Sequence, residues 1–362
     1  MIMRIKKALF LGTLCTAVSG MSLFAQAGVS YAKSAKETTE ASSEEATEVE
    51  TEEETSEEVT YPITIEHAFG ETVIESKPER IATVGWGNQD TPLALGIVPV
   101  GVSAANYGLV TDHKLHLWTD EAFADLGVEE PVVFDDVDGL DFEQISDCNP
   151  DVILAAYSGM TQEDYDTLSQ IAPVIPYKEN PWQTSWREQT IENAEGMGMK
   201  PEGEKKVKEV EDLIAEKLEE YPELEGIPTA FCWISADDFS TFYVYLPTDP
   251  RAAYLLDLGL TLPESVQKLA GETDDFNITV SRENADQLDD IQLMVVYGDE
   301  DLLKSLQEDK LMSQIPAIKN GAVALVDSTS ALAGACTPSI LSIPYEIDEY
   351  LQLLSDAAEN IK

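Results

Sequence analysis

The sequence predicts an α/β protein of two lobes joined by a single long helix. Short apolar runs alternate with longer amphipathic ones through residues 61–362, an alternation that is typical of parallel β-α units. The same alternation occurs in both halves of this region. Between the halves, residues 203–221 carry one apolar stripe at helical spacing. These three observations together predict the fold class.

The first half contains three expected strands, at residues 80–85, 98–102 and 151–156. Each is a short run rich in apolar or β-branched residues, which predicts a buried strand. Helices are expected at residues 90–95 and 142–148. Because helices separate the strands along the chain, we expect a parallel sheet.

The second half repeats this pattern, with expected strands at residues 229–234 and 291–297 and expected helices at residues 250–258 and 281–288. One spacing is shared between the halves. Glu143 precedes Tyr157 by fourteen residues, and Glu283 precedes Tyr297 by the same interval. Each interval predicts a helix, an acidic turn and an apolar strand. We interpret the two halves as lobes of related topology.

The predicted connecting helix places Val207, Val210, Ile214 and Leu218 on one face, and charged residues on the others. A single helix between two lobes would restrict hinge motion. The predicted organisation is therefore a first lobe at residues 61–202, a connecting helix at 203–222 and a second lobe at 223–362.

The N-terminus predicts export. A short basic start precedes an apolar run, and Ala25 and Ala27 form a small-residue exit, so residues 1–27 are predicted to be a signal peptide. Cleavage after Ala32, an uncleaved anchor and a lipid on Cys15 are the alternatives. The residues before Cys15 match the lipoprotein pattern poorly. Residues 28–60 are rich in Glu, Thr and Ser, which predicts a disordered linker.

The charge of the chain excludes two classes of partner. The whole sequence carries −47; the basic start contributes +3 and the linker −9, which leaves −41 on residues 61–362. Binding to nucleic acid or to an anionic membrane surface requires clustered Lys and Arg. We therefore expect neither partner.

No motif indicates an enzyme or a bound cofactor. The sequence has no nucleophile elbow and no Walker loop. Residues 85–90 imitate a dinucleotide loop, but Asp90 stands where a glycine is required and would repel a pyrophosphate.

The sequence also lacks the residues of a metal site. The three histidines, His67, His113 and His116, all fall in the first lobe, whereas a cleft that gripped a bare metal ion would draw ligands from both lobes. We expect His113 and His116 to face solvent. The three later cysteines form neither a disulfide framework nor a metal motif.

Aromatic and arginine side chains follow several expected strands. In α/β domains, ligands bind at the loops that follow the strands. Tyr297 ends one strand, and residues 328–338 form a polar loop of small residues. Aromatic surfaces with a few arginines suit a bulky, partly aromatic or anionic small molecule. The residues predicted to contact this ligand are Trp86, Tyr107, Tyr157, Trp182, Trp186, Arg187, Tyr243 and Arg251.

Several segments together resemble the substrate-binding proteins of iron-siderophore ABC transporters. They are Tyr-Pro-Ile-Thr-Ile at 61–65, Gly-Glu-Thr-Val at 70–73, Pro-Glu-Arg-Ile at 78–81, Leu-Gly-Ile-Val-Pro-Val-Gly at 95–101, Asn-Pro-Asp-Val-Ile at 149–153 and Ile-Ala-Pro-Val at 171–174. The resemblance implies two Rossmann-like lobes on a helical backbone, the periplasmic binding protein fold, with little closure on binding. It further implies a monomer outside the membrane that delivers a ferric siderophore to an ABC permease.

Members of that family typically dock through one acidic residue on each lobe. Counting back six residues from Gly96 gives Asp90, whereas the same count from Gly259 gives Ala253, a departure from the pattern. Asp249 or Asp257 is the expected substitute.

The expected ligand class follows from charge. Arg187 and Arg251 are the only arginines expected in the cleft, and the domain is strongly acidic, so a hydroxamate or mixed siderophore is favoured over a catecholate. A cobalamin or haem carrier on the same scaffold, or a surface module for a partner protein, are the alternatives.

Overall fold

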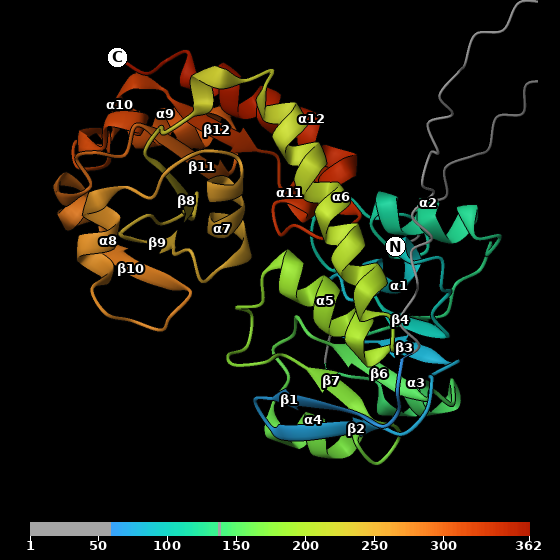
Figure 1. The fold of residues 1–362 in the computed structure, drawn as a ribbon. Coiled ribbons are helices and arrows are strands. Elements are labelled where there is room, and N and C mark those ends of the chain that lie inside the picture. Colours follow the sequence, from blue (N-terminus) through green and yellow to red (C-terminus); the bar gives the residue numbers. More distant parts are fainter. Residues whose placement is uncertain (1–58, 137–138) are drawn as a thin grey trace, which may run out of the picture. The chain divides into compact units, whose positions relative to one another are not determined.

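The computed structural model describes residues 59–136 and 139–362 (Figure 1). The predicted signal peptide, Cys15 and nearly all of the predicted linker lie outside the described residues. Within the described part of the chain, no helix is both long and apolar enough to cross a membrane.

The first lobe is built on a five-stranded parallel sheet, and its strand order is β5-β4-β3-β6-β7. The strands are β3 (Ile81–Thr83), β4 (Gly101–Ser103), β5 (Val133–Phe134), β6 (Val152–Ala155) and β7 (Val174–Pro176). The order reverses between β3 and β6, and in such sheets a ligand crevice forms beyond the carboxyl ends of these strands. The antiparallel pair β1 (Ile63–His67) and β2 (Gly70–Ile74) lies beside β7.

Short helices connect the strands of this lobe. They are α1 (Asp90–Ala94), α2 (Leu117–Asp125), α3 (Phe142–Asp147), α4 (Gln162–Leu168) and α5 (Trp186–Gly196). The starts of α4 and α5 are fixed by capping boxes, in which Thr161 and Ser185 exchange hydrogen bonds with an acidic residue three positions later. The predicted strands and helices of this lobe agree with the observed ones to within about three residues.

The second lobe has a mixed sheet, β10-β9-β8-β11-β12. The strands β8 (Thr229–Trp233), β11 (Leu293–Tyr297) and β12 (Val323–Val326) are parallel, whereas β9 (Thr241–Tyr245) and β10 (Asn277–Ser281) form an antiparallel edge. The related topology predicted from the fourteen-residue spacing applies to the centre of the two five-stranded sheets, where β6 and β11 each pair with the strand that comes first along the chain in their sheet, β3 and β8. The helix predicted before β11 is the 3₁₀-helix η2 (Arg282–Gln287).

The helices of the second lobe complete the fold. They are α7 (Pro250–Asp257), α8 (Glu264–Ala270), α9 (Glu300–Glu308), α10 (Pro316–Asn320), α11 (Ala331–Ala335) and α12 (Ser342–Ala358), with 3₁₀-helices η1 (Pro222–Leu224) and η3 (Met312–Gln314). Thus α11 occupies part of the segment at 328–338 that the sequence predicted to be a loop. The buried core lies on both faces of the sheet.

The connecting helix is α6 (Lys200–Leu218), which begins before the predicted residue 203 because Pro201 stands in its first turn. Its buried stripe, Val207, Val210 and Ile214, belongs to the main core of the second lobe. The helix packs on α5 and on α12, and Figure 1 shows α6 and α12 side by side. At Gly203 a Cβ would lie 2.5 Å from that of Ala194, so only glycine permits this close approach of α5 and α6.

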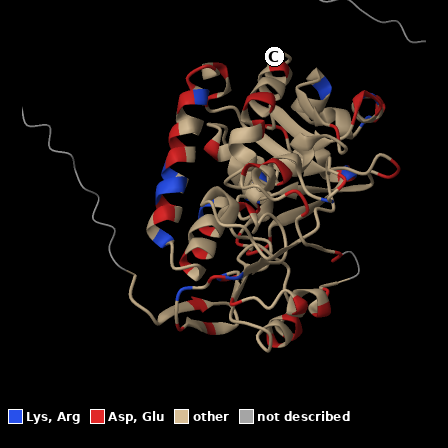
Figure 2. Cartoon of the chain, turned by 90° about the vertical axis from the view of Figure 1, so that its right-hand side faces the viewer, with Lys and Arg blue, Asp and Glu red and all other residues tan. Residues whose placement is uncertain are grey.

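Charged side chains are unevenly distributed over the surface. Acidic residues are scattered over many elements in Figure 2, whereas basic residues gather on the long helix α6. Several of these lysines are paired with acids: Lys206 with Glu209, Lys208 with Asp212, and Lys217 with Asp348. This face of α6 therefore presents mixed charge.

A buried carboxylate joins the first lobe to the C-terminal segment. Asp90, at the start of α1, is 1% exposed. Its oxygens accept hydrogen bonds from Trp118 Nε1 at 2.9 Å and Thr119 Oγ1 at 2.8 Å. The hydroxyl of Ser339, which lies between α11 and α12, donates to the same carboxylate at 2.5 Å. Residues of both lobes therefore satisfy this buried acid.

Asp90 is expected to make stability depend on pH. Burial raises the pKa of its carboxyl to about 6 from the ordinary 3.8, although its hydrogen bonds oppose the shift. Between these two pH values the native protein binds more protons than the unfolded chain. The contribution of the Asp90 carboxyl to the free energy of unfolding is therefore complete below about pH 4, and it falls as the pH rises through about 6. The free energy of unfolding of the wild type, minus that of Asp90→Asn, should fall by about 2–3 kcal/mol from pH 4 to 7.

The measurement is urea unfolding at several pH values. Asp286→Asn is the matched control, because Asp286 is exposed on the surface; its difference from the wild type should show no such trend. A pH-independent difference for Asp90→Asn would contradict the assignment.

Candidate ligand-binding site

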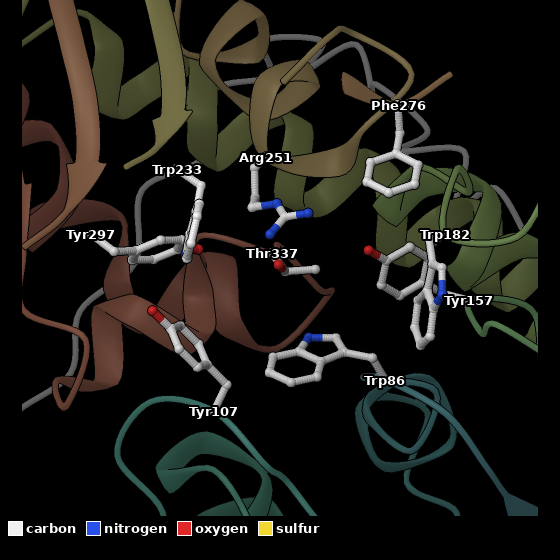
Figure 3. A pocket seen from close by; sticks show the side chains of 9 residues that line it. All are labelled: Trp86, Tyr107, Tyr157, Trp182, Trp233, Arg251, Phe276, Tyr297 and Thr337. Carbon is white, nitrogen blue, oxygen red and sulfur yellow. The ribbon is translucent and has the colours of Figure 1, made fainter. Parts of the chain in front are cut away.

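A cavity of about 380 Å³ is lined by residues of both lobes (Figure 3). Trp86 and Tyr157 follow β3 and β6, whereas Trp233 and Tyr297 end β8 and β11. The cavity thus lies at the carboxyl ends of the central strands of both sheets, where α/β folds bind ligands. The lining residues are Trp86, Tyr107, Tyr157, Trp182, Trp233, Arg251, Phe276, Tyr297 and Thr337.

Arg251 is the cation of this cavity, and Figure 3 shows its guanidinium pointing in among the aromatic rings. Asp249, the N-cap residue of α7, accepts from its Nε at 2.8 Å and its Nη2 at 2.6 Å. The guanidinium also lies 3.9 Å from the centroid of the Tyr245 ring. Burial works against its charge, but the hydrogen bonds and charge of Asp249 outweigh burial and raise the pKa of Arg251. Arg251 is therefore a fixed cation with its charge already matched.

The tyrosines of the cavity are neutral hydrogen-bond donors. Tyr107 and Tyr297, from different lobes, make an edge contact with ring centroids 5.2 Å apart. Burial raises the pKa of Tyr107 to about 12 and shifts the pKa values of Tyr157 and Tyr297 in the same direction. These hydroxyl groups stay protonated at neutral pH. They can donate to ligand oxygens without adding charge.

A buried amide network holds the loops that carry Trp86 and Tyr157. The Asn88 side chain donates to the carbonyls of Val84 at 2.8 Å and Tyr157 at 2.9 Å, and it accepts from the Tyr157 amide at 3.1 Å. Gln189, on α5, donates to the Trp86 carbonyl at 2.7 Å. Asn88 is fully buried. Two walls of the cavity are therefore fixed through one side chain.

Trp182 is one of the more exposed walls of the cavity, together with Tyr107 and Trp233. Its side chain is 38% exposed, and its ring makes an edge contact with that of Tyr157 at 5.3 Å. Its backbone has a φ of 62°, a left-handed conformation that is unusual for tryptophan. At Gly159 a Cβ would lie 2.4 Å from Trp182 Nε1. The ring can occupy this position because residue 159 is glycine.

Five of the eight predicted ligand residues line the cavity, and three do not. Trp186 is buried, and its Nε1 donates to Asp257 at 2.9 Å. Arg187 pairs with Glu211 at 2.7 Å and with Asp257 at 2.8 Å. Because Ser185 caps α5, both residues lie in its first turn and bond residues of α6 and α7. Their predicted place in the cavity is corrected accordingly.

The third exception is Tyr243, which is 40% exposed on strand β9, between β10 and β8. Its ring lies 5.5 Å from that of Trp233, which does line the cavity. Tyr243 therefore contacts a residue of the cavity wall but does not line the cavity itself.

The acidic residues predicted to dock a permease are not available at the surface. Asp90 and Asp249 are 1% and 0% exposed. Asp90 is satisfied by donors from both lobes, and Asp249 holds Arg251. Asp257, the other substitute, accepts from Trp186 and Arg187. A buried, satisfied carboxylate cannot pair with a partner's arginine without breaking these bonds.

His116 also differs from its prediction, because it is buried rather than exposed to solvent. Its Nε2 lies 3.0 Å from the Tyr107 carbonyl, and its ring stacks on Trp118 with centroids 4.5 Å apart. Burial lowers the pKa of His116 to about 4. His113 is partly exposed and lies 2.7 Å from Asp120. Among the described residues, no group of His, Cys, Asp and Glu could hold a metal ion.

The cavity also contains four residues outside the predicted set of ligand contacts: Trp233, Phe276, Tyr297 and Thr337. Tyr297 was recognised at the end of its strand, whereas Trp233, which ends β8 in the same way, was missed. Thr337 lies in the segment that was predicted to be a polar loop beside the ligand. Phe276 has no such signal, since it lies in the connection before β10.

Two α/β lobes, a connecting helix and a cavity at the strand ends of both lobes define the class of two-lobed ligand-binding proteins. The chain belongs to the periplasmic binding protein family, whose model matches residues 81–329.

Known relatives agree with this assignment. PiaA of Streptococcus pneumoniae TIGR4, solved in complex with ferrichrome, is 49% identical, with a TM-score of 0.80 over 83% of this chain and 100% of that chain. The petrobactin-binding protein YclQ of Bacillus subtilis is 24% identical over 80% of this chain and 88% of its own length. Staphylococcus aureus SirA, solved with staphyloferrin B, is 22% identical and shares the fold, with a TM-score of 0.63 over 83% of this chain and 99% of that chain.

Replacing Asn88 should loosen two walls of the cavity together. Asn88→Ala leaves the Tyr157 amide and two carbonyls without their buried partner, which should lower the free energy of unfolding by about 2–4 kcal/mol. Hydrogen exchange should also quicken at the amide of Tyr157, which loses its acceptor. Asp286→Ala, an exposed change, is the control for both measurements. Unchanged exchange at residue 157 would show that the network does not hold this wall.

Proposed function

We propose that this chain is the extracytoplasmic substrate-binding component of an ABC importer, and that it binds a ferric siderophore rather than acting as an enzyme. The observation that carries the proposal is the interlobe cavity, in which seven aromatic rings, Arg251 and Thr337 surround one space. A siderophore complex is bulky, and aromatic walls provide contact area at little cost in conformational entropy. The relative at 49% identity was solved with ferrichrome bound.

The charges of the cavity favour a neutral chelate, such as a ferric trihydroxamate. Arg251 is the one Lys or Arg among the lining residues that the structure describes, and Asp249 matches its charge. A triply anionic catecholate complex would bring unmatched charge into a partly buried site. A hydroxamate complex instead offers oxygen acceptors to the Arg251 guanidinium and to the hydroxyls of the tyrosines. The affinity would then come mainly from aromatic contact and from hydrogen bonds.

Export and the permease partner form part of the proposal. A protein of this family that carries a ferric siderophore has to meet the ligand outside the membrane and pass it to a permease. The signal peptide that the sequence predicts at residues 1–27 fits that place. Since Asp90 and Asp249 are buried, docking would use carboxylates on the surface.

Titration of tryptophan fluorescence tests the function directly, because Trp86, Trp182 and Trp233 line the cavity. Ferrichrome should quench the emission saturably with a submicromolar Kd. The iron-free ligand and a ferric tris-catecholate should bind at least about tenfold more weakly. Flat traces with every ferric chelate would remove the proposal. Saturation by cobalamin or haem alone would replace the ligand class.

Gly159→Ala should weaken binding without unfolding the protein. The new methyl group would displace the Trp182 ring, which is partly exposed and can move at little cost to stability. We expect about a tenfold increase in Kd for ferrichrome and an unchanged midpoint of urea unfolding. If the effect acts through the ring, Gly159→Ala should add nothing to Trp182→Ala. Additive losses, or wild-type affinity in Gly159→Ala, would contradict this account.

A further inference from the structure

A second cavity, of about 320 Å³, adjoins the first and shares the side chains of Trp86 and Trp182 with it. All the lining residues that the structure describes belong to the first lobe. Its polar residues include Ser103, Asn106 and Asp136. The two tryptophans separate two compartments of one cleft, so a ligand large enough to fill the first can extend into the second.

Asp136 is the most unusual residue of this second cavity. One carboxylate oxygen accepts a hydrogen bond from the Ser103 hydroxyl, which in turn accepts from the Gly85 amide at 3.2 Å. The other oxygen is buried and has no hydrogen-bond partner among the described residues. Burial raises the pKa of Asp136, and the neighbouring acids Asp141 and Asp135 add to the rise, while hydrogen bonds from Ser103 and from the Asp141 backbone oppose it. A buried acceptor without a partner is costly, and a donor from a ligand would relieve the cost.

The two compartments differ in the sign of their charged residues. Among its described lining residues, the first contains Arg251 and no acid. Among the described residues that line the second, Asp136 and Asp164 are acidic and none is Lys or Arg. A ligand with its chelated iron beside Arg251 and a positively charged arm beside Asp136 would match this arrangement. A ligand that is neutral throughout would leave the second compartment unmatched.

We propose that the second cavity is a subsite for an ammonium-bearing arm of the siderophore, with Asp136 as the residue that selects it. The inference rests on the proposed function, because it assumes that a ferric chelate occupies the first cavity. It goes further in naming the chemistry of the part of the ligand that lies beyond Trp86 and Trp182.

The test compares two ferric trihydroxamates that differ in one group. Ferrioxamine B is linear and ends in a primary ammonium; acetylation of that amine gives a neutral arm with the same chelate. The wild-type protein should bind the ammonium form about tenfold more tightly, as expected for one charge-assisted hydrogen bond. In Asp136→Asn, which keeps the shape and an oxygen for Ser103, the preference should fall to about onefold to twofold.

Two controls separate the subsite from general effects. Asp286→Asn removes one negative charge from an exposed position in the other lobe and should keep the tenfold preference. Ferrichrome, which carries no ammonium, should bind the wild type and Asp136→Asn with equal affinity. Equal affinity for ferrichrome also shows that Asp136→Asn is folded. If this variant does not fold, the comparison of the two linear chelates on the wild type alone decides whether the subsite exists.

Each outcome has one meaning. Equal binding of the two linear chelates to the wild type would overturn the subsite and leave the proposed function intact. If the wild type binds ferrichrome but neither linear chelate, the subsite is likewise overturned and the proposed function stands. A preference that persists in Asp136→Asn would overturn the role of Asp136. Failure to bind any ferric chelate would overturn the proposed function and the subsite together.

Discussion

The relation between the two lobes depends on a buried carboxylate that residues of both lobes satisfy. Asp90 accepts from Trp118 in the first lobe and from Ser339 in the C-terminal segment. Trp118 also stacks on His116, and the His116 ring lies 5.1 Å from that of Trp86. A single series of contacts thus leads from the joint between the lobes to the wall of the ligand cavity. A change at Asp90 would therefore alter the packing of Trp86 in the cavity wall.

The packing of the helices around the connecting helix α6 explains why the cavity exists before a ligand binds. The close packing of α6 on α5 requires Gly203, and α12 supports α6 along its other side. Within the first lobe, Asn88 fixes the backbone on either side of the cleft. A cavity whose walls are already ordered loses little conformational entropy on binding, so more of the contact energy appears as affinity. Trp182 and Trp233, which are partly exposed, are walls with more freedom to adjust.

The sequence predicted local features well and long-range contacts poorly. The strand-end rule located Trp86, Tyr107 and Tyr157, because periodicity identifies buried strands and their ends. That rule failed at Trp186, and the count from Gly96 gave no sign that Asp90 is buried, because the surroundings of both residues depend on residues far away along the chain. An acid at a helix start is usually exposed. No local feature of the sequence indicates that Asp90 is hydrogen-bonded by Ser339, which follows it by 249 residues. The antiparallel edge β9–β10 was missed for the same reason.

The acidity of the protein and the composition of its cleft together limit what can bind tightly. Residues 61–362 carry −41 by sequence, so an anion approaching the cleft meets repulsion before it reaches Arg251. That arginine cannot offer a full unpaired charge, because Asp249 already binds its guanidinium through two nitrogens. Affinity for a large ligand then has to come from aromatic area and from neutral donors. An acid such as Asp136 in the neighbouring compartment is tolerable for the same reason, because this cleft does not depend on attracting anions. The Asp136 carboxylate can therefore discriminate among ligands by the charge of their arm, without lowering the affinity for the chelate.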